Sequence, residues 1–144
     1  MPNPSGMTSS TSGKAHIFGY DITNSNEMEE IRKMTGICPQ HDVLFDELTP
    51  AEHLVFFARI RGMPEEKIAG EVKVILGDID LADKADELAG SLSGGQKRKL
   101  SVGIALIGDP KIIFLDEPTA GVDPYSRRWG QQQHVQFFHI GLAR

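Results

Sequence analysis

Two stretches of the chain decide the fold: Leu92-Ser93-Gly94-Gly95-Gln96 and Ile112-Ile113-Phe114-Leu115-Asp116-Glu117-Pro118. In the first, the serine and glutamine have the spacing of a capping box, which predicts a helix from Ser93 to about Ile107. In the second, four successive apolar residues indicate a strand covered on both faces. Ligands of open α/β sheets bind beyond the carboxyl ends of the strands. The acidic pair Asp116 and Glu117 therefore lies where chemistry is expected.

Each stretch also has a simpler interpretation. Asp116 and Glu117 can hold Mg²⁺ and orient water beside a nucleotide, or they can form an ordinary acidic turn after a strand. The hydroxyl of Ser93, the glycine N–H groups and the helix dipole can form an anion site, or they can simply cap a helix. The basic run Lys97-Arg98-Lys99 is interpreted as a solvated helix face, which is the usual meaning of such a run.

Outward from these stretches, turn and capping residues predict the other elements. We expect loop at residues 1–13, strands at residues 14–18 and 34–38, a turn at residues 19–21 and a short polar helix at residues 26–33. Thr49-Pro50-Ala51-Glu52 is a second capping box, which predicts a helix to about Arg61. Apolar residues at helical spacing predict a further helix, which begins near Pro64 and which Gly77 ends.

The composition is that of a globular chain of 144 residues, since 40% of it is hydrophobic and 24% is charged. The net charge of −5 argues against nucleic-acid binding, which usually leaves a basic footprint. Cys38 is the single cysteine, so no internal disulfide can form, and we expect it in the core. No apolar run approaches the roughly 20 residues that span a bilayer, and residues 1–5 lack the pattern of a signal peptide.

The two stretches occur in a distinctive order. Leu-Ser-Gly-Gly-Gln is followed by a helix, then by an apolar strand with Asp-Glu-Pro-Thr, then by Gly121-Val122-Asp123-Pro124. In this order the chain resembles the ATP-binding-cassette ATPases from about Gly6 to Arg128. The resemblance implies an α/β fold: an incomplete P-loop NTPase domain with an inserted helical subdomain at residues 41–91.

The resemblance also implies a role for each motif. Gln40 matches the glutamine that senses Mg²⁺ and faces the transmembrane partner, and Asp116 matches the aspartate that holds Mg²⁺. Glu117 matches the glutamate that polarises the attacking water, and Asp123 matches the aspartate that links the two sites of a dimer. Ser93-Gly94-Gly95-Gln96, called the signature motif below, matches the segment that contacts the γ-phosphate of ATP held by the opposing domain. ATP and Mg²⁺ are the implied ligands.

Within the family, the sequence resembles subfamily A, the full-length lipid exporters. The resemblance lies in residues 38–45, 96–101 and 116–128, including Tyr125-Ser126-Arg127-Arg128. It implies an ATPase at the cytosolic face of a membrane that drives the transport of lipid. The implied partners are a second nucleotide-binding domain and transmembrane domains, with no nucleic acid.

The sequence departs from the family pattern at both ends. Ser12-Gly13-Lys14-Ala15 is not a P-loop, because Thr8 stands where a glycine is required and Ala15 where serine or threonine is required. The P-loop and the aromatic residue that stacks on adenine are expected before Met1, so the chain alone is expected to be inactive. Residues 1–5 and 129–144 are expected to be unrelated or disordered ends, with His134 and His139 incidental.

Two alternatives stay open at this point. The chain can be a catalytically inactive fragment or interaction module that lacks ATP binding, which the missing P-loop favours. It can also be a cassette ATPase of the chromosome-maintenance type, although such proteins carry long coiled coils and no sustained heptads occur here. The remaining histidines, His16, His41 and His53, lack metal-ligand spacing.

Overall fold

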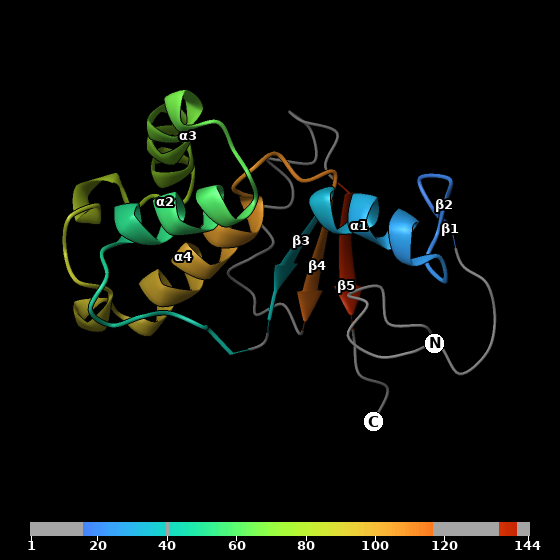
Figure 1. Ribbon diagram of the computed structural model, residues 1–144. Coiled ribbons are helices and arrows are strands. Elements are labelled where there is room, and N and C mark those ends of the chain that lie inside the picture. The colour runs from blue at the N-terminus through green and yellow to red at the C-terminus, as the bar shows by residue number, and fades with distance from the viewer. Residues whose placement is uncertain (1–15, 40, 117–135, 141–144) are drawn as a thin grey trace. The chain divides into compact units, whose positions relative to one another are not determined.

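The computed structural model describes residues 16–39, 41–116 and 136–140. The chain divides into two compact units, Met1–Thr35 and Gly36–Arg144. Figure 1 labels the helices and strands of both units.

The first unit begins with a tight hairpin. Strands β1 (His16–Ile17) and β2 (Tyr20–Asp21) pair antiparallel. Phe18 and Gly19 join them with φ of 50° and 85°. Positive φ at both central residues is the geometry that matches the twist of two paired strands. The strand predicted at residues 14–18 is thus confirmed at His16–Ile17, while Phe18 lies in the turn and the predicted turn at residues 19–21 contains a second short strand.

Helix α1 (Ser25–Lys33) completes this unit and confirms the predicted polar helix. Its N-cap is Asn24, whose side chain accepts a hydrogen bond from the Asn26 N–H at 3.1 Å. Such a cap satisfies one of the N–H groups that a helix leaves without an internal partner. Met28 and Ile31, three positions apart, are the buried residues of the helix.

The second unit contains a helical block (Figure 1), part of which falls within residues 41–91, where the helical subdomain is predicted. Its elements are α2 (Pro50–Ile60), α3 (Glu65–Asp78), the short 3₁₀ helices η1 (Ala82–Lys84) and η2 (Ala89–Ser91), and α4 (Gly94–Leu106). Both predicted capping boxes are present, at Thr49 for α2 and at Ser93 for α4. Helix starts specified by such local hydrogen bonds are readable from sequence, whereas the two 3₁₀ helices were not predicted.

The sheet of the second unit has the order β3-β4-β5 (Figure 1). Strands β3 (Thr35–Cys38) and β4 (Ile112–Asp116) confirm the two predictions. Strand β5 (Gln136–Ile140) pairs parallel with β4, with Ile112 opposite Gln136. No element is predicted there, so at residues 136–140 the structure differs from the disorder that is one of the two expectations for residues 129–144. Aromatic residues such as Phe137 and Phe138 favour strands, but so short a run gives a weak signal.

Helix α4 packs closely against β3, and glycine makes this possible. A Cβ atom added at Gly36 would collide with the backbone carbonyl oxygen of Ala105 and would lie 3.3 Å from Cγ1 of Ile113. A Cβ added at Gly103 would likewise lie 2.9 Å from Cδ1 of Ile79. Side chains of α2, α3, α4 and β4 meet in one apolar core, which also contains Cys38.

One polar side chain, His53, is fully buried in this helical block. Its Nε2 accepts a hydrogen bond from the Phe45 N–H at 2.9 Å, and its Nδ1 lies 2.8 Å from the Thr49 carbonyl oxygen. A carbonyl oxygen can only accept, so Nδ1 is the donor. The ring thus connects the loop before α2 to the start of that helix, and a buried polar group gains the partners that it needs.

Candidate functional site

The signature motif forms the N-terminus of α4. Ser93 accepts a hydrogen bond through Oγ from the Gln96 N–H at 3.3 Å, and Oε1 of Gln96 accepts one from the Ser93 N–H at 2.8 Å. The motif therefore holds its own shape through two reciprocal contacts. Ser93, Gly94 and Gly95 are exposed, and Gln96 is half-buried. The structure thus brings together the four residues predicted for this part of the site.

The space over the two glycines is open. Within the described part of the chain, a Cβ atom added at Gly94 or Gly95 would meet nothing within 4 Å. The first N–H groups of a helix have no partner within it, and the helix dipole adds partial positive charge there. An exposed helix start of this kind can receive a phosphate group, with the glycines allowing close approach. The open helix start is compatible with the predicted anion site, which stays a prediction.

The basic run after the motif does not form a solvated face, so that interpretation is wrong. Lys97, Arg98 and Lys99 each pair with an acidic residue elsewhere in the chain, and their side chains are only 28%, 13% and 32% exposed. The pairs are Lys97 with Asp46 at 3.0 Å, Arg98 with Asp42 at 3.2 Å, and Lys99 with Asp80 at 2.9 Å. These contacts fasten loops onto the start of α4. The sequence gives no signal for them, because the partners lie 19 to 56 positions apart.

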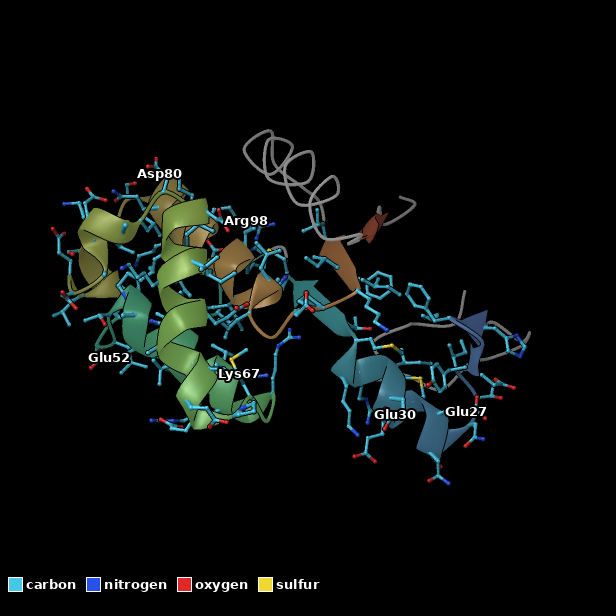
Figure 2. All side chains as sticks on the ribbon, turned by 90° about the horizontal axis from the view of Figure 1, so that it is seen from above. Glu27, Glu30, Glu52, Lys67, Asp80 and Arg98 are labelled. Carbon is cyan, nitrogen blue, oxygen red and sulfur yellow. The ribbon has the colours of Figure 1, made fainter. Side chains whose placement is uncertain are left out.

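Arg98 makes a second contact with the segment that follows β3. Its Nη1 donates to the Pro39 carbonyl oxygen at 2.5 Å as well as to Oδ1 of Asp42. Figure 2 labels the Arg98 side chain. Pro39 and Asp42 bracket Gln40 in the sequence. Arg98 therefore connects the helix of the signature motif to both sides of a second predicted site residue, although sequence reasoning did not single it out.

The other predicted site residues lie at the edge of the described structure or outside it. Asp116 is the last residue of β4, so it stands at the carboxyl end of a strand as predicted. Gln40, Glu117 and Asp123 lie outside the described residues. Their predicted roles with Mg²⁺, water and the second domain stay predictions.

Cys38, the last residue of β3, lies in the core as predicted, with no exposed surface. Burial raises the pKa of its thiol, the positive charge of Arg98 opposes this, and the negative charge of Asp42 adds to it. The described residues contain no group of three or more His, Cys, Asp or Glu side chains that could hold a metal ion.

With this geometry in place, the comparison with protein families is decisive. The sequence model of the family described as ABC transporter matches residues 4–120. The chain belongs to the ABC transporter family. The match includes the signature motif, β4 and Glu117, and it confirms the resemblance found in the sequence.

Its ABC transporter relatives include proteins of subfamily A. ATP-binding cassette sub-family A member 2 of Homo sapiens is 54% identical over 123 residues, which make up 85% of this chain and 5% of that protein. Phospholipid-transporting ATPase ABCA3 of Mus musculus is 54% identical over 123 residues, which make up 85% of this chain and 7% of that protein. The predicted likeness to subfamily A is confirmed, and the chain spans a small part of the length of these relatives.

A solved structure shows the same ABC ATPase fold. It is that of cbiO1 from Clostridium perfringens, part of the ABC transporter complex cbiONQ, with a TM-score of 0.80 at 24% identity. The match covers 95% of this chain and 58% of that chain. The predicted class, part of an α/β P-loop NTPase domain with an inserted helical subdomain, is therefore confirmed. Among the described residues, no helix has the length and apolar character needed to cross a membrane.

Proposed function

We propose that these residues form part of a nucleotide-binding domain that, in the intact transporter, binds and hydrolyses ATP between two such domains. The signature motif contacts the γ-phosphate of ATP held by the opposing domain. Membership of the family supports this, as does the open N-terminus of α4. That helix start is the observation that carries the proposal, because it offers N–H groups and a positive dipole end outward.

The catalytic roles belong to the end of β4 and to the segment after β3. Asp116 and Gln40 would hold Mg²⁺, and Glu117 would polarise the attacking water. Mg²⁺, when bound, neutralises negative charge on the phosphates, and catalysis of this transfer consists mostly of positioning and electrostatic stabilisation. Asp123 would link the two sites across the pair of domains. The position of Asp116 at the carboxyl end of a parallel strand supports this assignment.

The cargo and the setting follow from the relatives. One relative is named a phospholipid-transporting ATPase and another a cholesterol transporter. We therefore propose lipid as the transported class, transmembrane domains and a second nucleotide-binding domain as partners, and the cytosolic face of a membrane as the location.

Two matched capping boxes allow a test of the signature motif. The test uses a complete nucleotide-binding domain in which these residues follow a P-loop. Ser93→Ala and Thr49→Ala each remove the hydroxyl from a capping box, so each should destabilise its helix by about 1 kcal/mol. Only Ser93→Ala should lower ATP turnover, because only Ser93 faces a nucleotide. Equal ATP turnover in the two variants would mean that Ser93 of the signature motif does not contact nucleotide.

A bulkier substitution tests action across the pair of domains. Ser93→Arg fills the space over the helix start but leaves the P-loop of the same domain intact. The mutated domain should therefore still be photolabelled by a nucleotide analogue at its own P-loop. Trapping of nucleotide at the opposing domain should fail. Labelling lost in the mutated domain and kept in its partner would mean that the motif serves its own domain, contrary to the proposal.

A further inference from the structure

The side chain of Arg98 ties the start of α4 to the segment after β3. Nη1 of Arg98 donates to the carbonyl oxygen of Pro39 at 2.5 Å and to Oδ1 of Asp42 at 3.2 Å. The two contacts span 59 and 56 positions of sequence. The Arg98 side chain is 13% exposed, and that of Asp42 is 24% exposed. Hydrogen bonds from a charged donor in so enclosed a place are stronger than those between neutral groups.

The same segment is fastened again further along the chain. Lys97 pairs with Asp46, whose carbonyl oxygen accepts from the Gly90 N–H at 3.1 Å. The Ala89 N–H donates to the Leu48 carbonyl oxygen at 2.8 Å. Residues 42–48 are therefore held against the approach to α4 and its first turns. Arg98 extends this attachment back to Pro39.

We propose that Arg98 is a positioning residue that holds Pro39 and Asp42, the residues bracketing Gln40, against the helix of the signature motif. Guanidinium suits this task because its rigid planar fork fixes the directions of its N–H groups toward a carbonyl and a carboxylate, whereas a lysine ammonium is a compact charge on a flexible stem. The hydrogen bonds of Arg98 to Pro39 and Asp42 form a tether between the two segments. The effect of this tether on ATP turnover rests on the proposed function. The tether itself does not, and it can be tested without nucleotide.

Cys38 gives a built-in reporter of the tether. It is the only cysteine of the chain, it is fully buried, and it directly precedes Pro39. A buried thiol reacts with a reagent only when the segment around it opens. The positive charge of Arg98 lowers the pKa of this thiol against the effect of burial. Removing that charge alone would therefore slow labelling, because less thiolate would be present, whereas loosening the segment would speed it.

The experiment follows the reaction of the 144-residue chain with 5,5′-dithiobis(2-nitrobenzoic acid) at one pH. We expect Arg98→Met to speed Cys38 labelling at least tenfold, because the loss of two charge-assisted hydrogen bonds favours local opening of the segment. Arg98→Lys should restore part of the protection, and Asp42→Asn should speed labelling less than Arg98→Met. The matched control is Lys99→Met, which removes a neighbouring cation paired with Asp80 and should leave the rate unchanged.

Amide hydrogen exchange of α2 and α3 in the same samples distinguishes local opening around Cys38 from a general loosening of the fold. Unchanged exchange in these helices together with faster Cys38 labelling supports the proposal. Labelling that is unchanged or slower in both Arg98→Met and Asp42→Asn overturns it, as does equal acceleration by Lys99→Met or faster exchange throughout α2 and α3. If the labelling result holds while a complete domain carrying Arg98→Met turns over ATP normally, the role proposed for Gln40 fails and the tether stands.

Discussion

At the scale of single residues, Glu71 on α3 is a carboxylate in an unfavourable place. Burial raises the pKa of its side chain, and the nearby negative charges of Asp109 and Asp78 raise it further. A carboxyl group whose pKa is higher in the folded chain than in the unfolded chain destabilises the fold when both states are ionised. The penalty disappears as the pH falls through the folded pKa to below the unfolded value, since the group is then protonated in both states.

Glu71→Gln should therefore raise the free energy of unfolding at pH 7, and the difference from the parent should shrink to nothing below about pH 4. The measurement is the urea midpoint of both chains across this pH range. Glu66→Gln, at an exposed position in the first turn of the same helix, is the control. It should be slightly destabilising at pH 7, because acidic residues near a helix N-terminus are favourable. A gain at pH 7 that persists at low pH would contradict the electrostatic explanation.

Sequence reasoning at this scale succeeded where the information is local. Ser93 and Gln96 were predicted because a capping box is written in four adjacent positions. Arg98 was missed because its partners, Pro39 and Asp42, become neighbours only after β3 and α4 have packed together. A run of basic residues in sequence does not reveal whether each charge meets water or a distant carboxylate.

At the scale of elements, the fit of α4 against β3 depends on Gly36. We expect Gly36→Ala to lower the free energy of unfolding by about 3 kcal/mol, since the added methyl group meets a backbone carbonyl that cannot rotate away. Gly70→Ala is the matched control, because Gly70 lies in α3 with nothing within 4 Å of an added Cβ among the described residues. That change should instead stabilise the chain by about 1 kcal/mol. Urea unfolding followed by circular dichroism measures both, and a tolerant Gly36 would mean that α4 packs less closely.

The elements divide by how they are specified. Helices α2 and α4 begin at capping boxes and α1 begins at a capping asparagine, so their starts were readable. Strand β5 depends on pairing with β4, and the 3₁₀ helices η1 and η2 lie where the chain turns between helices. Such elements are fixed by their neighbours in space, and a short window of sequence does not specify them.

At the scale of the whole molecule, the chain has the signature motif without the P-loop pattern Gly-x-x-x-x-Gly-Lys-Ser/Thr. The backbone and lysine of that loop supply most of the contacts to the phosphates of ATP. We expect the 144-residue chain to bind MgATP more weakly than micromolar and to show no turnover. Isothermal titration calorimetry measures the first and phosphate release the second. Micromolar, Mg²⁺-dependent binding would show that other residues of this chain suffice.

The buried ring of His53 has a consequence for the direction of the hydrogen bonds around it. The Phe45 N–H donates a hydrogen bond to Nε2 of the ring, and Nδ1 of the ring donates one to the Thr49 carbonyl oxygen. That carbonyl oxygen also accepts a hydrogen bond from the backbone N–H of His53 at 2.9 Å. The imidazole therefore accepts at one nitrogen and donates at the other, and only the tautomer with its proton on Nδ1 fits both partners. Turning the ring over would place carbon atoms where these nitrogens stand. The two nitrogens flank Cε1 in one rigid ring, so the directions of the two hydrogen bonds are fixed relative to each other.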